Sequence, residues 1–168
     1  MTERSPAPGG LALVEALVNT LDIESGADSL DTAEGRARFG ITTDETDRAR
    51  TLRESLRATL LAHAGHPPHR EVPPLGDLLA AAPLVVTVDT ADGSAALTPT
   101  DAGTLHARVA AAVAESLIAG TWTRLKVCEA PDCHWAYYDR SPAGRGRWCS
   151  MQVCGARAKM RRYRAKGA

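Results

Sequence analysis

The stretch Cys128–Lys166, CEAPDCHWAYYDRSPAGRGRWCSMQVCGARAKMRRYRAK, contains all four cysteines of this 168-residue chain. The cysteines form two pairs, each with four residues between its members, and fifteen residues separate the pairs. Two short turns that each offer two sulfurs, joined by a loop, are what a tetrahedral zinc site needs. We therefore expect one structural Zn²⁺, bound by Cys128, Cys133, Cys149 and Cys154.

The rest of the sequence favours a compartment in which thiols stay reduced. The first ten residues contain acid, proline and glycine where a signal peptide would have basic and then apolar residues. No stretch approaches the roughly 18 uninterrupted apolar residues that a membrane span requires. We expect a cytoplasmic protein with no membrane partner.

Other uses of the cysteines remain open at this point. They could be unconnected thiols or two disulfides, or His134 could replace one of them as a ligand. In a reducing compartment, however, clustered cysteines are more often metal ligands than disulfides. Four sulfurs already fill a closed structural site, which leaves no open position for water or substrate and argues against catalytic zinc.

The residues around the cysteines predict a treble-clef-like module of knuckle, hairpin and basic helix. CEAPDC suits a turn, HWAYY at 134–138 suits a strand, and the turn-rich residues 139–146 lead through 147–148 back to Cys149. A helix is expected to begin near Ser150. The module's own core is expected to contain three aromatic residues, which we prefer to a role as stacking platforms: Trp135, Tyr137 and Trp148.

Charge is divided unevenly along the chain. Residues 124–168 hold eleven basic and three acidic side chains, a net charge of +8, and the first 123 residues therefore have a net charge of −8. Within 157–166 there are six Arg or Lys and no acid. Such asymmetry favours a polyanionic partner, with DNA ahead of RNA, the ribosome or an acidic protein. The expected DNA contacts are Arg145, Arg147, Arg157, Lys159, Arg161, Arg162, Arg164 and Lys166.

The first 120 residues read as mainly α-helical with one small β-hairpin. Leucines recur every four residues in several segments, and Asp-Gly at 92–93 lies between two β-branched or apolar runs. Helices are expected at 11–21, 29–40, 42–65, 75–82 and 101–120, with the hairpin at 84–99. The expected organisation is a disordered start at 1–10, a helical regulatory domain at 11–121 and a zinc finger at 122–168.

Two sets of polar residues suggest alternative functions, a metal-dependent enzyme and a ligand pocket. His63, His66 and His69 invite a metal-dependent enzyme, but they lie in or beside a proline-broken loop with no suitable pair of carboxylates nearby. Asn19 and Thr20 could line a pocket, although such residues more often make hydrogen bonds within a helical domain. We do not expect an enzyme.

Residues 128–166 resemble the CGNR zinc finger, whose members have the same two cysteine pairs, WCSM around the third cysteine and CGNRAK before basic residues. More weakly, GGLALVEALVNTLD and the region up to about Thr121 resemble the stress-induced transcription regulator domain called ABATE, which usually contains FVNT. The resemblance implies a bacterial transcription regulator whose finger binds zinc and DNA. It also implies an N-terminal domain that senses something, for which we expect a small-molecule effector. Independently of the resemblance, a helix-rich N-terminal domain could form a homodimer, which would match paired half-sites on DNA.

The chain departs from the zinc-finger signature at one position and from the FVNT motif of the N-terminal domain at another. The resemblance makes the four cysteines the ligands and places Gly155, Arg157 and Lys159 in the signature. Ala156 stands where the signature has Asn, so a side-chain amide that could cap the helix or contact DNA is missing. Leu17 stands where Phe is common, a change that a hydrophobic core accommodates by repacking.

Overall fold

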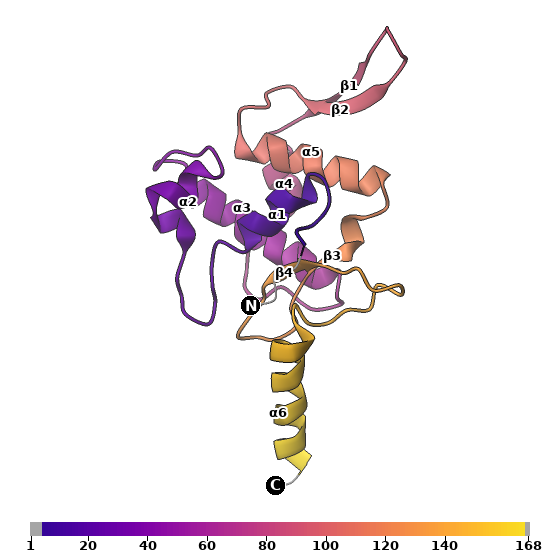
Figure 1. Ribbon diagram of the computed structural model, residues 1–168. Coiled ribbons are helices and arrows are strands. Elements are labelled where there is room, and N and C mark those ends of the chain that lie inside the picture. Colours follow the sequence, from indigo (N-terminus) through magenta and orange to yellow (C-terminus); the bar gives the residue numbers. More distant parts are fainter. Residues whose placement is uncertain (1–4, 167–168) are drawn as a thin grey trace.

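The computed structural model describes residues 5–166 and is mostly helical, with two small antiparallel sheets (Figure 1). This confirms the predicted fold class. No helix within 5–166 has both the length and the apolar composition needed to cross a membrane. The helices are α1 Leu11–Val18, α2 Ala33–Ala37, α3 Thr46–Ala62, α4 Leu75–Leu79, α5 Leu105–Ile118 and α6 Ala156–Lys166, and the strands are β1 Leu84–Val88, β2 Ala95–Pro99, β3 Leu125–Val127 and β4 Ala136–Tyr138.

The main core lies between α1, α3 and α5. Leu52, Leu56 and Leu60 recur every four residues on α3 and are fully buried, as their spacing predicts. α1 packs against both α3 and α5, and the apolar residues of the three helices form one hydrophobic cluster. The buried residues of α1 and α5 include Leu11, Val14, Leu17, Val18, Leu105, Val109 and Ala112.

The helices are shorter than the sequence predicts. α1 ends at Val18 rather than at Leu21, because the next two side chains make tertiary hydrogen bonds and Leu21 forms a β-bridge with Asp28. The predicted helix at 29–40 is interrupted at Thr32, whose side chain caps α2 by accepting a hydrogen bond from the backbone of Gly35.

The start of the chain lies partly on the body of the protein. Residues 1–4 of the segment expected to be disordered fall outside the described residues. In the remainder, Ala7 is buried and its backbone N–H donates to the Glu15 carboxylate at 2.5 Å. The Arg140 guanidinium donates to the backbone carbonyls of Ser5 and Pro6.

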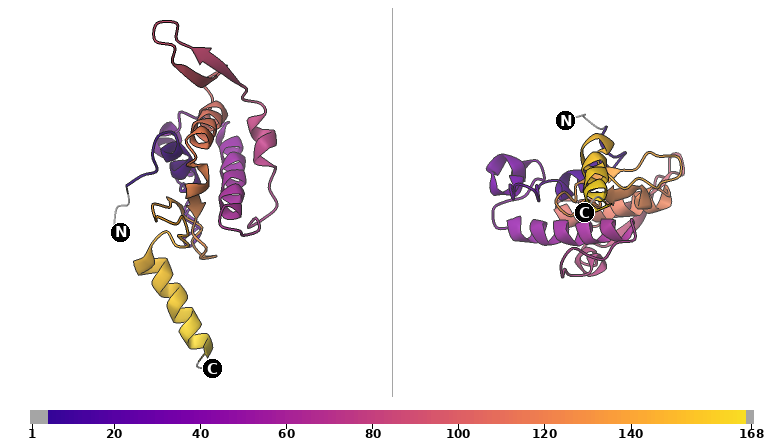
Figure 2. Two further views of the ribbon diagram at one scale, coloured as in Figure 1. Left: turned by 90° about the vertical axis from the view of Figure 1, so that its right-hand side faces the viewer. Right: turned by 90° about the horizontal axis from the view of Figure 1, so that it is seen from below.

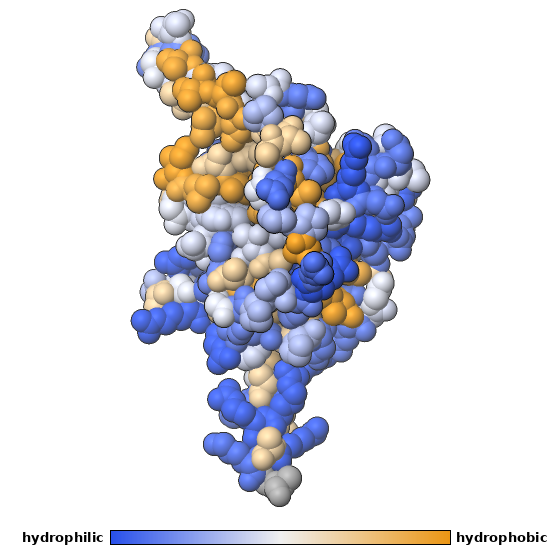
Figure 3. Space-filling model, turned by 180° about the vertical axis from the view of Figure 1, so that it is seen from behind, coloured by the Kyte–Doolittle hydropathy of each residue, from blue (hydrophilic) through white to orange (hydrophobic). Residues whose placement is uncertain are grey.

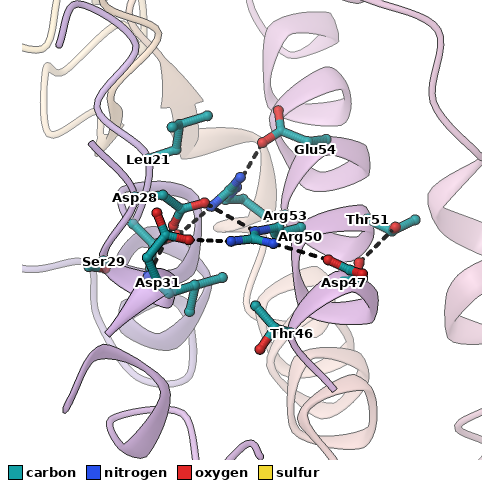
Figure 4. Close-up of polar contacts among 12 residues, drawn as sticks. Leu21, Asp28, Ser29, Asp31, Thr46, Asp47, Arg50, Thr51, Arg53 and Glu54 are labelled. Atoms are coloured by element: carbon teal, nitrogen blue, oxygen red, sulfur yellow. Dashed lines mark hydrogen bonds and ion pairs between the residues drawn. The ribbon is translucent and has the colours of Figure 1, made fainter. Parts of the chain in front are cut away.

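A network of buried charges links α3 to the segment that follows α1, and sequence periodicity did not predict it (Figure 4). Arg53, Glu54 and Arg57 are each no more than 3% exposed. Glu54 accepts hydrogen bonds from Arg53 at 2.7 Å and from Arg57 at 3.0 Å. Arg53 also pairs with Asp28 at 2.7 Å. Buried charges persist only when they are paired in this way.

The network also holds the backbone at the end of α1. Arg57 donates to the carbonyl of Val18 at 2.7 Å, and Arg53 donates to the Thr20 hydroxyl at 3.0 Å. Between these two residues, the Asn19 amide donates to the Ala136 carbonyl and accepts from the Ala136 N–H, at 3.0 and 2.7 Å. The VNT sequence therefore joins the helical region to strand β4.

Apart from a small cluster around the cysteines, the apolar residues of the C-terminal region pack into the core of the helices. Trp122, Leu125, Val127 and Ala136 belong to the same hydrophobic cluster as α1, α3 and α5. Strand β3 packs against α3, and β4 packs against α1. By contrast, α6 projects away from the body, as two perpendicular views show (Figures 1 and 2). The expected division at residues 121 and 122 therefore crosses a continuous hydrophobic core.

The β1–β2 hairpin forms at the predicted position and extends from the end of the molecule opposite to α6 (Figure 1). Val85, Val86 and Val88 are exposed on it, and Leu117 and Ile118 of α5 are also exposed. Seen from behind, the hairpin is largely hydrophobic, whereas α6 is hydrophilic (Figure 3).

Glu54→Gln is predicted to destabilise the protein by about 3–5 kcal/mol at pH 7, because it leaves the buried Arg57 guanidinium without its counter-charge and leaves Arg53 with Asp28 as its remaining carboxylate partner. Urea denaturation followed by circular dichroism measures the loss. Glu71→Gln, on the exposed loop between α3 and α4, is the control and is expected to change stability by less than about 0.5 kcal/mol. Equal stability of the two variants would contradict this role for Glu54.

The same carboxylate predicts a pH dependence. Burial acts to raise the pKa of Glu54, but Arg57 and Arg53 outweigh it and hold that pKa below its ordinary value of 4.5. Its stabilising contribution is therefore complete above pH 4.5 and is lost as pH falls through the lower folded-state pKa. We expect the stability difference between wild type and Glu54→Gln to shrink as the pH is lowered in that range.

Candidate metal centre and basic helix

The first cysteine pair lies in a knuckle enclosed by the β3–β4 hairpin. Strand β3 runs directly into Cys128, whose N–H donates to the carbonyl of Trp135 at 2.9 Å. The turn closes with two hydrogen bonds to the Ala130 carbonyl, from the N–H groups of Cys133 and His134. His134 has a φ of +44°, the left-handed conformation that reverses the chain into β4.

The hairpin differs from the predicted one in its pairing. The sequence suggested that 134–138 would be followed by a return strand at 147–148, but the partner of β4 is β3, which precedes the first cysteine. Arg147 contributes a single backbone bond, accepting from the N–H of Glu129 at 3.0 Å. The reason is burial: β3 is fully buried and its Leu125 and Val127 lie in the main core, whereas Arg147 is exposed and Trp148 is only half-buried.

The second cysteine pair lies at the start of the predicted basic helix. The Ser150 side chain accepts a hydrogen bond from the Val153 N–H and caps this end. The first turn, Met151–Gly155, is a π-helix in which the Gly155 N–H donates to the Ser150 carbonyl at 3.0 Å. A Cβ on Gly155 would lie 3.3 Å from both Met151 and Trp148, so this tight position favours glycine.

The four sulfur atoms converge on one point. They all lie within 4.8 Å of one another, with Cys133 to Cys149 at 3.6 Å and Cys149 to Cys154 at 3.7 Å. A zinc ion with Zn–S bonds of about 2.3 Å has tetrahedron edges of about 3.8 Å, whereas a disulfide bond is about 2.05 Å long. The donor set and its spacing therefore fit one zinc ion and not two disulfides.

The thiols strongly perturb one another's ionisation. Contacts with the Cys133 and Cys149 thiols lower the pKa of Cys128 to about 2, and the contact with Cys128 raises the pKa of Cys133 to about 12. The pKa of Cys149 is raised as well, first by its contact with Cys128. Each further thiolate would add a like charge beside the first, so a bound dication is what allows all four to ionise together.

The histidines considered as alternative ligands lie elsewhere. His63 is hydrogen-bonded to the Leu125 carbonyl at 2.8 Å, and His69 contacts the Glu54 carboxylate at 2.9 Å. His66 lies 3.4 Å from Glu129. Throughout residues 5–166 the four cysteines are the only group of three or more metal-binding side chains close enough to share an ion, and neither His134 nor the other histidines belong to it.

The three aromatic residues expected in the finger's core have different environments. Tyr137 is buried in β4, and Trp148 is half-buried against the cysteine cluster. Trp135 is exposed at the hairpin turn, so its indole contributes less to the core than predicted. Trp122, to which the sequence gave no role, packs in the main core beside the His63 ring.

The loop between β4 and the second cysteine pair is organised by one buried carboxylate that the sequence analysis did not identify. Asp139 pairs with Lys126 at 3.1 Å and accepts from the N–H groups of Ser141 and Gly146. These hydrogen bonds outweigh burial and lower its pKa to about 2. A Cβ on Gly146 would lie 2.8 Å from the carboxylate. The closely spaced glycines at 144 and 146 were the feature of the sequence that could have indicated this tightly packed loop.

The eight basic residues expected to contact DNA divide into two groups. Three have carboxylate partners: Arg147 with Glu129 at 2.6 Å, Arg157 with Glu24 at 3.0 Å, and Arg161 with Asp132 at 3.9 Å. The others form no ion pair with any residue in the described part of the chain: Arg145, Lys159, Arg162, Arg164 and Lys166.

This fold combines a helical domain with a four-cysteine zinc finger that ends in a basic helix. The chain belongs to the ABATE family, described as "Putative stress-induced transcription regulator", whose model matches residues 11–120. The CGNR zinc finger model matches residues 124–167. Both are regulatory rather than enzymatic classes, so the chain is a zinc-binding regulator. No curated protein matches it.

Cobalt substitution tests the ligand set. We expect the Co²⁺-loaded protein to show the thiolate-to-cobalt charge-transfer bands of a four-sulfur site, because all four sulfurs lie at ligand spacing. Cys149→Ser is expected to lose or weaken these bands. His134→Asn, which keeps a residue tolerant of the left-handed conformation, is the control and is expected to leave them unchanged. A spectrum that changed with His134→Asn would place the imidazole in the coordination sphere.

Proposed function

We propose that this protein is a zinc-dependent, DNA-binding transcription regulator. The observation that supports this most directly is helix α6, which projects from the cysteine cluster and buries none of its side chains. Its residues 157–166 contain six basic side chains and no acid. The positive charges of such a helix repel one another, and a bound polyanion would neutralise them.

Zinc supplies the rigid base of this helix. Cys154 lies in the π-turn immediately before α6, so a metal bound by the four sulfurs anchors the end from which the helix extends. Lys and Arg on α6 would neutralise DNA phosphates and supply affinity. Arg145 and Arg147 would extend the contact onto the finger's loop. Loss of the metal would release the helix, because so short a helix is marginal alone.

The absence of the signature Asn at position 156 affects how the protein could recognise a DNA base sequence. Ala156 is exposed in the first turn of α6. A methyl group there cannot donate or accept the hydrogen bonds that distinguish base pairs. We infer that most of the affinity comes from phosphate contacts and that base discrimination, if present, comes from arginines further along the helix.

A cleft in the helical domain supports a second element of the proposal, a small-molecule effector. The cleft has a volume of about 640 Å³ and is lined by residues of α3, α4 and α5, within the range of roughly 300–1,000 Å³ usual for ligand sites. Leu78 and Leu105 are among its apolar residues. Glu45, Asp77 and His106 lie among its polar residues. The ligand class that fits is a small, largely apolar molecule with at least one polar group.

Dimerisation stays a prediction. The surface that we propose for contact with a second copy is the face of the β1–β2 hairpin on which the exposed Val86 and Val88 lie, since side chains two positions apart in a strand share a face. Two-stranded hairpins are marginally stable alone, so pairing with another strand edge would stabilise this one. Paired fingers would then match paired half-sites on DNA.

Salt dependence of binding tests the main proposal. We expect the zinc-loaded protein to bind duplex DNA with a log–log salt slope of about −4, which corresponds to release of counterions from several phosphates. Fluorescence anisotropy with a labelled duplex measures it, and the same protein treated with a chelator is expected to lose most of the binding. A salt-independent interaction would refute the proposal.

Competition distinguishes the alternative function, in which the basic finger binds RNA, the ribosome or an acidic protein. Duplex DNA, duplex RNA and single-stranded RNA of equal length are added to the preformed complex. Displacement chiefly by DNA, and by one selected sequence over bulk DNA, is the result expected of a regulator. Displacement chiefly by RNA would favour the adaptor.

The cleft is tested with Nile red, a neutral dye whose fluorescence rises in apolar sites. Ala81→Phe narrows the cleft at its exposed edge and is expected to reduce dye binding several-fold. Ala62→Phe, an equally exposed change at the end of α3 outside the cleft, is the control. Equal Nile red binding by both variants would contradict the proposal that the cleft is the effector site.

A further inference from the structure

We propose that α6 has two flanks with different roles. The flank that includes Arg157 and Arg161 is held by an acidic clasp, defined as the carboxylates of Glu24 and Asp132. The opposite, open flank binds the phosphodiester backbone of duplex DNA; its members are Lys159, Arg162 and Lys166. The DNA half of this inference rests on the proposed function, whereas the clasp itself does not.

Helical geometry separates the two flanks. At 3.6 residues per turn, Arg157 and Arg161 are four positions apart and share one face. Lys159, Arg162 and Lys166 fall on the opposite face, three and four positions apart from one another. All of these side chains are exposed on a helix that buries none of its residues. The difference between the flanks therefore comes from what each one faces, not from burial.

The clasp consists of two ion pairs from different parts of the chain. One guanidinium nitrogen of Arg157 lies 3.0 and 3.1 Å from the two carboxylate oxygens of Glu24, 133 residues away. Arg161 lies 3.9 Å from Asp132, in the first cysteine knuckle. The other oxygen of Asp132 is buried and has no hydrogen-bond partner within residues 5–166, so it remains available to a cation.

Glu24 is presented by an ordered loop rather than by a free side chain on a mobile segment. The N–H groups of Glu24 and Ser25 donate to the side chain of Asp22, and the Gly26 N–H donates to its carbonyl. Gly26 has a φ of +74°, which glycine adopts without strain. The base of the loop is closed by the Leu21–Asp28 bridge, and Asp28 is held by the buried Arg53.

Few other contacts restrain α6. Among the helices and strands of the described residues, α6 packs chiefly on the π-turn Met151–Gly155, to which it is covalently joined. Among residues 5–166, the two ion pairs of the clasp are the only ion pairs that α6 makes with the body. Exposed ion pairs are individually weak and are screened by salt. The clasp therefore biases the direction of the helix without locking it.

The clasp determines which flank DNA meets. Carboxylates beside Arg157 and Arg161 partly cancel their charge and repel phosphate groups that approach from that side. On the open flank no carboxylate of the described residues pairs with the positive charges, so we expect counterion release to be undiminished there. Tyr163, which is 76% exposed and adjacent to this flank, offers an aromatic side chain that could pack on the sugar–phosphate backbone.

Neighbouring variants on the same helix test the flanks. Arg162→Gln and Arg161→Gln remove the same charge from adjacent exposed positions, so they are matched controls for each other. Fluorescence anisotropy with duplex DNA is repeated over a salt series with the zinc-loaded full chain. We expect Arg162→Gln, and likewise Lys159→Gln, to lower the salt slope by about 0.9 each. Arg161→Gln and Arg157→Gln are expected to leave it nearly unchanged. Equal losses on both flanks, or a larger loss on the clasped flank, would overturn the assignment.

The clasp is tested without DNA by the ¹⁵N heteronuclear NOE of α6 amides. Glu24→Gln is expected to lower the NOE values along 157–166, because it removes one of the restraints on the helix. Glu34→Gln, an exposed acid on α2, is the control. Unchanged values in Glu24→Gln would overturn the clasp. If the wild-type protein bound DNA without salt dependence, the proposed function and the DNA half of this inference would fall together, and the NOE would still decide the clasp.

Discussion

Convergence of four thiolates on one zinc ion is the constraint on which the functional end of the molecule depends. Three sulfur positions lie outside regular strands and helices, and the fourth lies in a π-turn, so no extended hydrogen-bond ladder holds these segments together. The apolar cluster around the sulfurs contains, besides the cysteines, only Ala130 and Trp148. Metal ligation therefore has to supply most of the local folding free energy, as in other small zinc modules. The metal centre also positions α6, because Cys154 lies in the π-turn that precedes this helix.

The finger is nevertheless not a structural module separate from the helical domain. Its sheet completes the main hydrophobic core, and Asn19 pairs with the backbone of β4 as another strand residue would. The buried Arg53–Glu54–Arg57 network contacts both neighbours of Asn19, the backbone carbonyl of Val18 and the side-chain hydroxyl of Thr20. A change in the helical domain that shifted the end of α1 would therefore reach β4 and the first cysteine directly. This connection gives a physical route between the cleft of the helical domain and the finger, through α3, which contributes to both the cleft and the network.

Electrostatics then organise the exposed surface. The chain's balanced total charge hides an acidic helical region and a basic finger. Where the two meet, Glu24 and Asp132 pair with the nearer side of α6 and leave the farther side unopposed. These carboxylates thus leave α6 with one side whose positive charges are paired and one side whose positive charges are not. Arg147, paired with Glu129 and stacked on Trp148, is restrained in a similar way.

The sequence alone determined the metal site, the basic helix and the α3 leucine stripe, because cysteine spacing, charge runs and apolar periodicity are local properties of the chain. It also indicated the β1–β2 hairpin through its Asp-Gly turn. Only the tertiary structure decided that β4 pairs with β3, that Asn19 joins the finger to the helices, and that Glu24 meets Arg157. These partners are 117 residues apart for Asn19 and Ala136 and 133 for Glu24 and Arg157. Such pairs are selected by how the helices pack and where buried charges find counter-charges, and no local pattern of residues encodes that choice.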